Sequence, residues 1–359
     1  MNVNINVIFS FSRSYIIFLT LFTIIQKSFA VLPNYTPALP QNVAMRKDEL
    51  VWHYFEQGYS NDEIACFLAV HHGIVLCIRT IKRILKRLNL KRASKRNQSP
   101  LESIVRAILQ EIDNSSGSFL GYRQLTQRLR RKCQLNVTRD MIMRYVRIID
   151  PEGVNNRRKR RLKRRKYTNP GPNFLWHIDG WDKLAPFGFY IHAAIDGFSR
   201  RILWLEVGSS NKNPRFIAWH YLNAVQQLGG VPKLMRSDRG TENVVIRDLQ
   251  QLLRWDNGDS LEGSKSFIQG KSSSNQRIES WWSKLREGGW WINFFKDIRD
   301  SGIDIDDPVL RECLKFCFMP ILRKELFLVA ELWNTHTIQS QPRQEITSGK
   351  PDVLFFMPE

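Results

Sequence analysis

A chain of 359 residues, 43% of them hydrophobic, is longer than one ordinary domain and apolar enough to form cores, which excludes a disordered protein and predicts two or three domains. The formal net charge of +20 is concentrated in one block, because residues 79–166 hold 27 Lys and Arg against 6 Asp and Glu while the rest is close to neutral. Such a block indicates a polyanionic partner, above all nucleic acid, and the alternative is a solubilising charged surface.

The five cysteines have neither the number nor the spacing of a disulfide framework, which favours a reduced compartment. His71, His72 and Cys77 lie close in sequence without a CxxC pair, so a zinc site is not expected there. Cys313 and Cys317 lie four residues apart in an apolar helical pattern and are expected in a core.

Residues 1–45 are interpreted as a leader and linker. The apolar run from Tyr15 to Ile25 resembles the hydrophobic region of a signal peptide and is too short to span a bilayer. Secretion does not suit the basic block that follows, so we discount the segment as a targeting signal and expect it to be poorly ordered. Three prolines between Leu32 and Pro40 indicate a linker.

Residues 46–98 have the pattern of three short helices separated by turns. Gly58 ends the first helix, and Ser60 with Glu63 predicts a capping box at the start of the second. The third helix has an apolar face opposite a basic face, which consists of Arg79, Lys82, Arg83, Lys86 and Arg87. We expect a helix-turn-helix whose basic face contacts DNA, and the alternative is an amphipathic helix with a solvated face.

A second helical unit that binds DNA is predicted over residues 99–156, where three amphipathic patterns follow Pro100. Residues 157–173 then form a basic linker. Its first ten residues, RRKRRLKRRK, include nine basic side chains, which repel one another and bury nothing. We expect this run to bind phosphate, to act as a nuclear localisation signal, or both. Its basic residues are Arg157, Arg158, Lys159, Arg160, Arg161, Lys163, Arg164, Arg165 and Lys166.

The pattern of elements over residues 174–338 predicts an α/β core. Three consecutive hairpin strands are followed by a helix, a strand, a helix, a short strand and a further helix. This is the order of a ribonuclease H-like fold, a mixed five-stranded sheet flanked by helices. Apolar helical patterns complete the core, and residues 339–359 are interpreted as a tail.

Three carboxylates in this core indicate one metal-dependent site. Asp179 lies in an apolar strand, Asp238 follows another strand, and Glu279 begins a helix after a Ser-rich stretch. A buried carboxylate is costly unless a partner compensates it, and carboxylate oxygens are the ligands that Mg²⁺ prefers. Each residue alone has an ordinary explanation, as a turn, a cap or a first-turn acid of a helix.

The segments WHIDGW, AAIDGFSRRILWLEV, RSDRGTEN and SNQRIESWW resemble the catalytic core of retroviral and retrotransposon integrases and of insertion-sequence transposases. They repeat the Asp, Asp, Glu triad in the family's order, with 40 residues between Asp238 and Glu279. The resemblance covers residues 173–286. It implies a DDE-type polynucleotidyl transferase in which Asp179, Asp238 and Glu279 are the catalytic residues and hold Mg²⁺ or Mn²⁺, two ions per site.

The same resemblance implies that DNA is the partner, that the protein works as a homo-oligomer holding two DNA ends, and that it acts in the nucleus. No membrane and no small-molecule substrate is expected. Lys284 and Arg286, on the helix of Glu279, are predicted to contact DNA phosphate. Asn275 and Arg277 are further candidates for positioning the substrate.

Three other acids are rivals for the metal. Asp196 is the strongest of them, although its IDGFS context favours a structural turn, and Asp182 and Glu242 are weaker. The alternative to an active integrase is a catalytically silent, host-retained DNA-binding or scaffold protein derived from a mobile element. The complete triad favours the enzyme.

Overall fold

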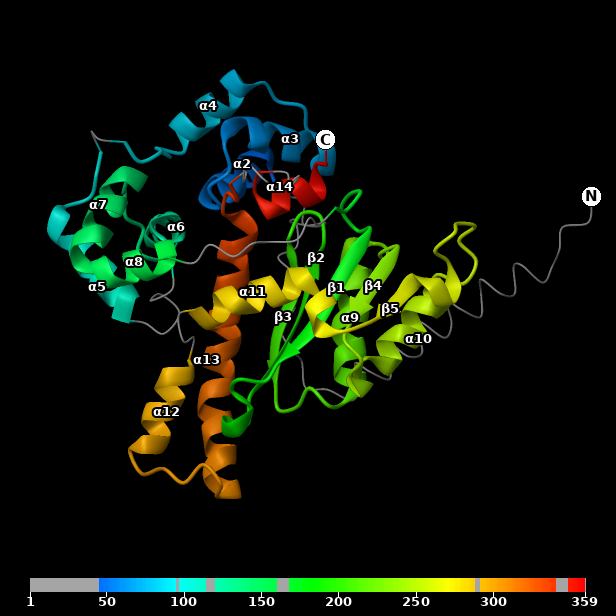
Figure 1. The fold of residues 1–359 in the computed structure, drawn as a ribbon. Helices are drawn as coiled ribbons and strands as arrows, with labels where there is room; N and C mark the ends of the chain where they lie inside the picture. The colour runs from blue at the N-terminus through cyan, green and yellow to red at the C-terminus, as the bar shows by residue number, and fades with distance from the viewer. Residues whose placement is uncertain are drawn as a thin grey trace, which may run out of the picture.

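The computed structural model describes residues 45–94, 97–113, 120–159, 168–287, 291–339 and 348–358. Within these residues the apolar side chains form three separate clusters: one in the sheet and its helices and one in each of two helical units (Figure 1). No helix of the described part is both long and apolar enough to cross a membrane. The predicted leader, apart from its last residue, and most of the predicted basic run lie outside the described residues.

The first helical unit consists of α2 (Lys47–Glu56), α3 (Asn61–His72) and α4 (Ile78–Arg87). The predicted capping box is present, since the Ser60 side chain accepts from the Glu63 N–H and the Glu63 side chain accepts from the Ser60 N–H. Gly58 adopts φ +82°, a left-handed conformation that glycine tolerates without strain. The three helices bury a common apolar core and leave the basic face of α4 exposed.

The second helical unit consists of α5 (Leu101–Asp113), α6 (Tyr122–Lys132), α7 (Arg139–Ile149) and α8 (Pro151–Lys159). A buried ion pair between Arg128 and Glu111 lies inside it. Arg128 also contacts Glu325 at 3.4 Å, and Arg131 contacts Glu331 at 3.4 Å, which joins α6 to the long helix α13 (Pro308–Thr335).

The core sheet has the order β3-β2-β1-β4-β5, antiparallel among β1, β2 and β3 and parallel from β1 through β4 to β5. This is the predicted ribonuclease H-like arrangement, and the fold class is confirmed. The strands are β1 (Leu175–Trp181), β2 (Tyr190–Asp196), β3 (Ile202–Gly208), β4 (Leu234–Ser237) and β5 (Phe267–Gln269).

Successive side chains of β1 point to opposite faces of the sheet. Trp176 packs on one face against Tyr221 of α9 (Pro214–Leu228), which is next to α10 (Val244–Leu253). On the other face Trp181 stacks on Trp282 of α11 (Gln276–Glu287). The sheet is therefore covered by helices on both sides.

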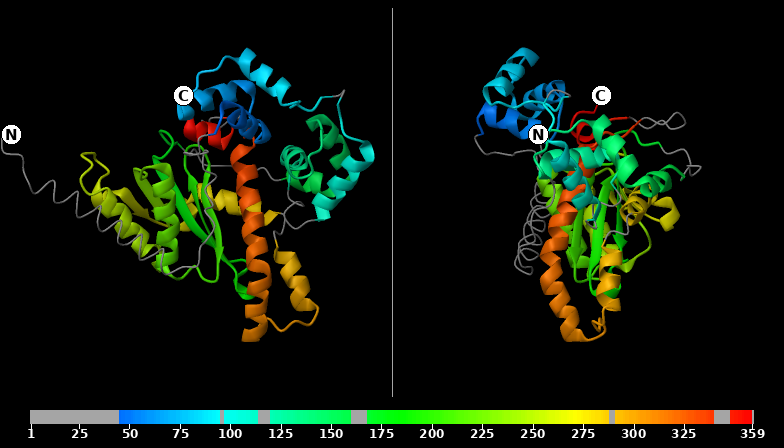
Figure 2. Two further views of the ribbon diagram at one scale, coloured as in Figure 1. Left: turned by 180° about the vertical axis from the view of Figure 1, so that it is seen from behind. Right: turned by 90° about the vertical axis from the view of Figure 1, so that its left-hand side faces the viewer.

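Helix α13 runs along the outer strand β3. Helix α12 (Ile292–Asp300) lies alongside the end of α13 that points away from the two helical units (Figure 2). At the strand edge the Ile202 N–H donates to Asn334 Oδ1 at 2.8 Å, and Asn334 Nδ2 donates to the Ile202 carbonyl at 3.0 Å. The expectation that Cys313 and Cys317 lie in a core is wrong, because both are exposed. Most buried positions of α13 follow Leu322, whereas the two cysteines lie in the half that extends past the sheet.

Residues 348–358, which the sequence presents only as part of a tail, contain helix α14 (Pro351–Phe356). Asp352 is buried where three parts of the chain meet: it accepts from the Tyr59 hydroxyl at 2.9 Å and from Arg201 Nε at 2.8 Å. Lys350 contacts Glu63 at 2.6 Å. The C-terminal helix therefore joins the first helical unit to the sheet, and the C terminus lies beside that unit in Figure 1.

Candidate active site

Asp179 lies in the middle of β1, on the face covered by α11. Its Oδ2 accepts a hydrogen bond from Trp282 Nε1 at 3.0 Å, and the Trp282 ring is buried against Trp181. The carboxylate is only partly exposed. Strand packing and an indole donor therefore fix its direction.

Asp238 follows the last residue of β4, where the chain leaves the sheet. Its Oδ1 accepts from the Gly240 N–H and from Asn243 Nδ2, both at 3.2 Å. Asn243 is buried and also donates to Glu242 Oε1 at 2.9 Å. The Glu242 carboxylate occupies the space that a Cβ at position 240 would need, so a larger residue there would displace the Glu242 side chain.

Glu279 lies in the first turn of α11, and Asn275 fixes the start of that helix on β1. Asn275 Oδ1 lies 2.7 Å from His177 Nδ1, and Asn275 Nδ2 donates to the Ile178 carbonyl at 2.8 Å. Asn275 is 1% exposed, so it positions α11 and does not reach a substrate. Arg277 donates to the Gly197 carbonyl at 3.0 Å and anchors the same helix to the turn after β2.

The three carboxylates lie within electrostatic reach of one another. Burial, then the charge of Glu279, then that of Asp238 raise the pKa of Asp179 to about 7. Burial and the charge of Asp238 also raise the pKa of Glu279. Burial raises the pKa of Glu242, as do the charges of Asp238 and Asp182. All five acids of this region were named from the sequence, with Asp182 and Glu242 as weaker rivals for the metal, and the structure places the charges of Asp182 and Asp238 close enough to affect Glu242.

Among the described residues, no three His, Cys, Asp or Glu side chains are gathered closely enough to hold a metal ion. The donor chemistry nevertheless suits Mg²⁺ or Mn²⁺, because Asp179, Asp238 and Glu279 present only carboxylate oxygens. A divalent cation would also reverse the like-charge repulsion that raises the pKa of Asp179. The donor chemistry of the three residues therefore suits a divalent metal ion, and the metal itself stays a prediction.

Asp196, the strongest rival, has a structural role as expected. It is fully buried, and its carboxylate accepts from the N–H groups of Asn173, Phe198 and Ser199 and from the Ser199 hydroxyl. Its oxygens are therefore used in holding the turn between β2 and β3.

The predicted DNA-contacting residues fall into three groups. All five basic residues of α4 are exposed. Arg157, Arg158 and Lys159 end α8, whereas Arg160, Arg161, Lys163, Arg164, Arg165 and Lys166 lie outside the described residues. On α11, Arg286 is exposed and the Lys284 ammonium lies over the Trp333 ring, 4.2 Å from its centre.

Two residues of the site were missed from the sequence. The Trp282 ring is buried in the core, and its indole N–H orients Asp179. Asn243 orients Asp238 from within the loop RSDRGTEN. An amide five residues after a strand-end aspartate is a weak signal, and an indole 103 residues from its acceptor gives none.

The sheet order and the neighbouring carboxylates of β1, the loop after β4 and α11 define a ribonuclease H-like protein with an acidic site. The family model described as integrase core domain matches residues 166–349, and the chain belongs to this family. No curated protein matches the chain. Among solved structures, a chain of the Mos1 strand transfer complex aligns over 84% of this chain and 99% of that chain, with 11% sequence identity and a TM-score of 0.18. Because that TM-score is low, the assignment depends on the family match and the sheet topology.

Proposed function

We propose that this protein binds DNA and that its core is a DDE-type polynucleotidyl transferase, which cleaves phosphodiester bonds and transfers DNA strands. The observation that supports this most strongly is that burial, the charge of Glu279 and the charge of Asp238 raise the pKa of Asp179, and that burial and the charge of Asp238 raise the pKa of Glu279. A strongly shifted carboxylate beside other acids favours a functional role over a structural one.

Asp179, Asp238 and Glu279 would hold Mg²⁺ or Mn²⁺. When bound, two such ions supply an activated nucleophile and stabilise the leaving oxygen. The residues around the triad have positioning roles: Trp282 directs Asp179, Asn243 directs Asp238, and Asn275 holds α11 on β1 so that Glu279 faces the other two acids. Arg286, exposed on α11, would hold a DNA phosphate near the site.

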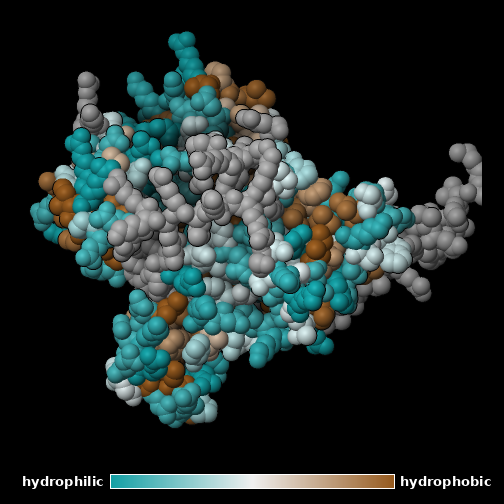
Figure 3. All heavy atoms as spheres, in the orientation of Figure 1, coloured by the Kyte–Doolittle hydropathy of each residue, from teal (hydrophilic) through white to brown (hydrophobic). Residues whose placement is uncertain are grey.

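We also propose that the active form is a homo-oligomer that acts in the nucleus. Large apolar side chains are exposed along the first half of α13, with Phe316 84% and Val309 69% exposed. Apolar side chains gather on the α12–α13 hairpin in Figure 3. Such surfaces suit contact with another protein chain, and we expect Phe316→Asp to shift the full chain toward monomer in analytical ultracentrifugation.

The catalytic proposal is tested with the full chain on end-labelled duplex DNA in the presence of Mg²⁺ or Mn²⁺. We expect nicked or joined products that disappear with Glu279→Gln and remain with Glu312→Gln, a matched control on the exposed surface of α13. If neither the natural chain nor the control gives products while both bind DNA and remain folded, the protein is the catalytically silent DNA-binding or scaffold protein instead.

A further inference from the structure

A basic cleft lies between the two helical units and the end of α13, and the sequence analysis did not find it. Its volume is about 920 Å³. Seven Lys and Arg side chains line it against one acid, Glu56, and none of the three triad carboxylates is among its lining residues. Six of the cations come from the helical units: Lys91, Arg92, Arg123, Arg130, Arg131 and Arg139. The seventh, Lys350, precedes α14.

The cleft exists only because distant segments meet. Lys91 and Arg92 follow α4, Arg123 to Arg131 belong to α6, and Arg139 opens α7. Residues 335–337 at the end of α13 form another part of the wall. Figure 1 shows α4, α6 and the upper end of α13 around this region. The cleft therefore joins both helical units to the core.

Two cations of the cleft are held by hydrogen bonds to neutral groups. Arg130 donates through Nε and Nη2 to the Val137 carbonyl at 2.9 and 2.7 Å. Arg92 donates to the Tyr59 carbonyl at 2.7 Å and to Asn61 Oδ1 at 2.9 Å. These bonds fix the guanidinium groups in place without pairing them to carboxylates.

Like charges oppose each other inside the cleft. Burial, and then the charge of Arg92, lower the pKa of Arg130. Arg92 and Arg130 come from different helical units, so the units repel each other at this point. In the described part of the chain, Arg123 Nε and Arg131 Nη1 are buried without a hydrogen-bond partner. An anion between the units would relieve the repulsion and accept from these donors.

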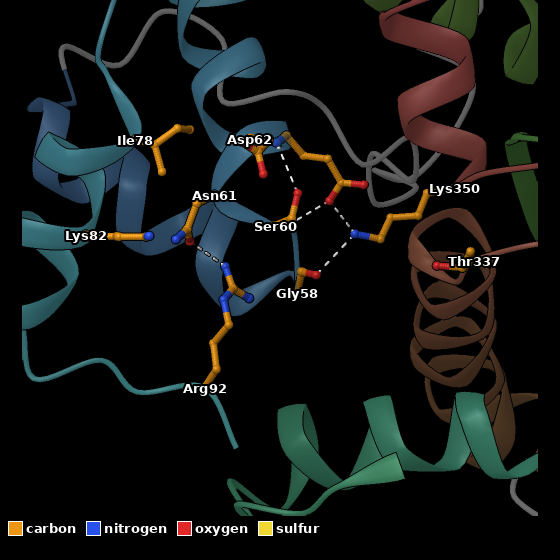
Figure 4. Close-up of a pocket in the computed structure, with 10 residues that line it drawn as sticks. Gly58, Ser60, Asn61, Asp62, Ile78, Lys82, Arg92, Thr337 and Lys350 are labelled. Carbon is orange, nitrogen blue, oxygen red and sulfur yellow. Dashed lines mark hydrogen bonds and ion pairs between the residues drawn. The ribbon is translucent and has the colours of Figure 1, made fainter. Parts of the chain in front are cut away.

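A smaller hollow of about 560 Å³ continues the cleft toward α4. The two share Gly58, Arg92, Thr337 and Lys350. Figure 4 shows Lys82 and Arg92 entering this hollow from different elements, with Lys350 on its other side. The basic face of α4 therefore leads into the cleft through this hollow. Glu63 and Lys350, which both line the hollow, form an ion pair with each other.

We propose that the cleft binds the phosphodiester backbone of one strand of duplex DNA, and that the bound strand bridges the two helical units and continues along α4. The choice of DNA as the partner rests on the proposed function. Guanidinium groups in fixed positions match phosphate oxygens and do not read base edges. The cleft therefore contributes affinity and alignment, and sequence preference comes from elsewhere.

The test is the salt dependence of binding by the full chain to a fluorescein-labelled duplex of mixed sequence in EDTA. The variant Lys91→Glu with Arg139→Glu changes two exposed cations of the cleft. We expect the slope of log K against log salt to fall by about 2, because each lost phosphate contact removes about 0.9. The control Arg247→Glu with Arg299→Glu makes the same charge change on α10 and α12. A cleft variant that keeps the natural slope, or loses no more than the control, overturns the proposal.

A second measurement needs no variant. We expect duplex DNA to protect Lys91 from acetylation by an amine-reactive ester, as read by mass spectrometry, and to leave the exposed Lys296 of α12 reactive. Equal acetylation of Lys91 with and without DNA would overturn the proposal.

The two proposals fail separately. Binding is measured in EDTA, which removes the metal ions that the triad would need. If DNA protects Lys91 from acetylation but no strand is cleaved in the presence of metal, only the catalytic proposal is overturned. Cleavage together with unprotected Lys91 overturns only the cleft.

Discussion

The carboxylate site and the basic cleft have the same electrostatic construction with opposite signs. In the first, β1, the β4 loop and α11 bring negative charges together, and the pKa of Asp179 rises to about 7. In the second, two helical units bring positive charges together, and the pKa of Arg130 falls. Each arrangement costs folding free energy until a ligand of opposite charge is bound. Both regions therefore combine burial with the opposition of like charges.

The largest effect is expected at the carboxylate site. Asp179→Asn should lower strand cleavage by at least roughly 1,000-fold, because metal ions supply several kcal/mol of transition-state stabilisation. The folded pKa of Asp179 lies above the unfolded value, so its contribution to stability is lost as pH rises through about 7. In EDTA at pH 8 the same variant should raise the free energy of unfolding by up to about 4 kcal/mol, since each of about three pKa units corresponds to roughly 1.4 kcal/mol. A variant that is inactive and also less stable in urea denaturation would show that Asp179 has a structural role.

The buried ion pair that joins α14 to the sheet should contribute more to stability than an ion pair on the surface. Asp352→Ala leaves Arg201 buried without its carboxylate partner, which costs about 3–5 kcal/mol. We expect a loss of that size in urea denaturation, and faster proteolysis of the first helical unit. The exposed Asp306→Ala, which removes a surface ion pair with Arg311, is the control and should change stability by less than about 1 kcal/mol.

Trp282→Phe separates positioning from packing at the carboxylate site. The variant keeps a ring against Trp181 and removes the hydrogen bond to Asp179. We expect cleavage to fall by about 10- to 100-fold, in the range for groups that orient metal ligands, with a matching loss of Mn²⁺ affinity in calorimetry. Unchanged Mn²⁺ affinity would mean that the indole does not orient the carboxylate.

The smallest effect per pH unit is a pH dependence that comes from two histidines, one in β2 and one in α9. Burial lowers the pKa of His192 and of His220 to about 3. Each histidine therefore stays neutral in the folded chain, and its stabilisation is complete above pH 6.5 and declines as pH falls toward 3. We expect each to cost on the order of 1 kcal/mol per pH unit in that window. His220→Gln should make the urea concentration at the unfolding midpoint fall less steeply as pH decreases below 6.5. An unchanged pH dependence of that midpoint contradicts this account.

Local patterns were enough to predict the sheet, whereas the role of Asp179, Asp238 and Glu279 as a metal-binding triad stays a prediction. Alternating apolar residues with Gly-containing turns marked the hairpin strands, and Asp179, Asp238 and Glu279 appeared in short motifs of fixed order. The turn role of Asp196 was also readable, because all but one of its four donors lie within three residues.

Features that depend on distant contacts were not predictable. Arg92 and Arg130 lie 38 positions apart and belong to different helical units, so the repulsion between their charges appears only in the folded chain. The partners of Asp352 are 293 and 151 residues away. The exposure of Cys313 and Cys317 was predicted wrongly because an apolar helix that extends past its sheet has the same pattern as a buried one.

The amide of Asn334 has a consequence for how copies of this chain can meet. It forms hydrogen bonds with both the N–H and the carbonyl of Ile202, which a neighbouring strand would otherwise pair with. An outer strand with free backbone groups is a template on which another molecule can extend the sheet, and a side chain that takes up those groups blocks the extension. Growth of fibrils through β3 is therefore blocked at this residue, and assembly along this side of the molecule has to use helix surfaces.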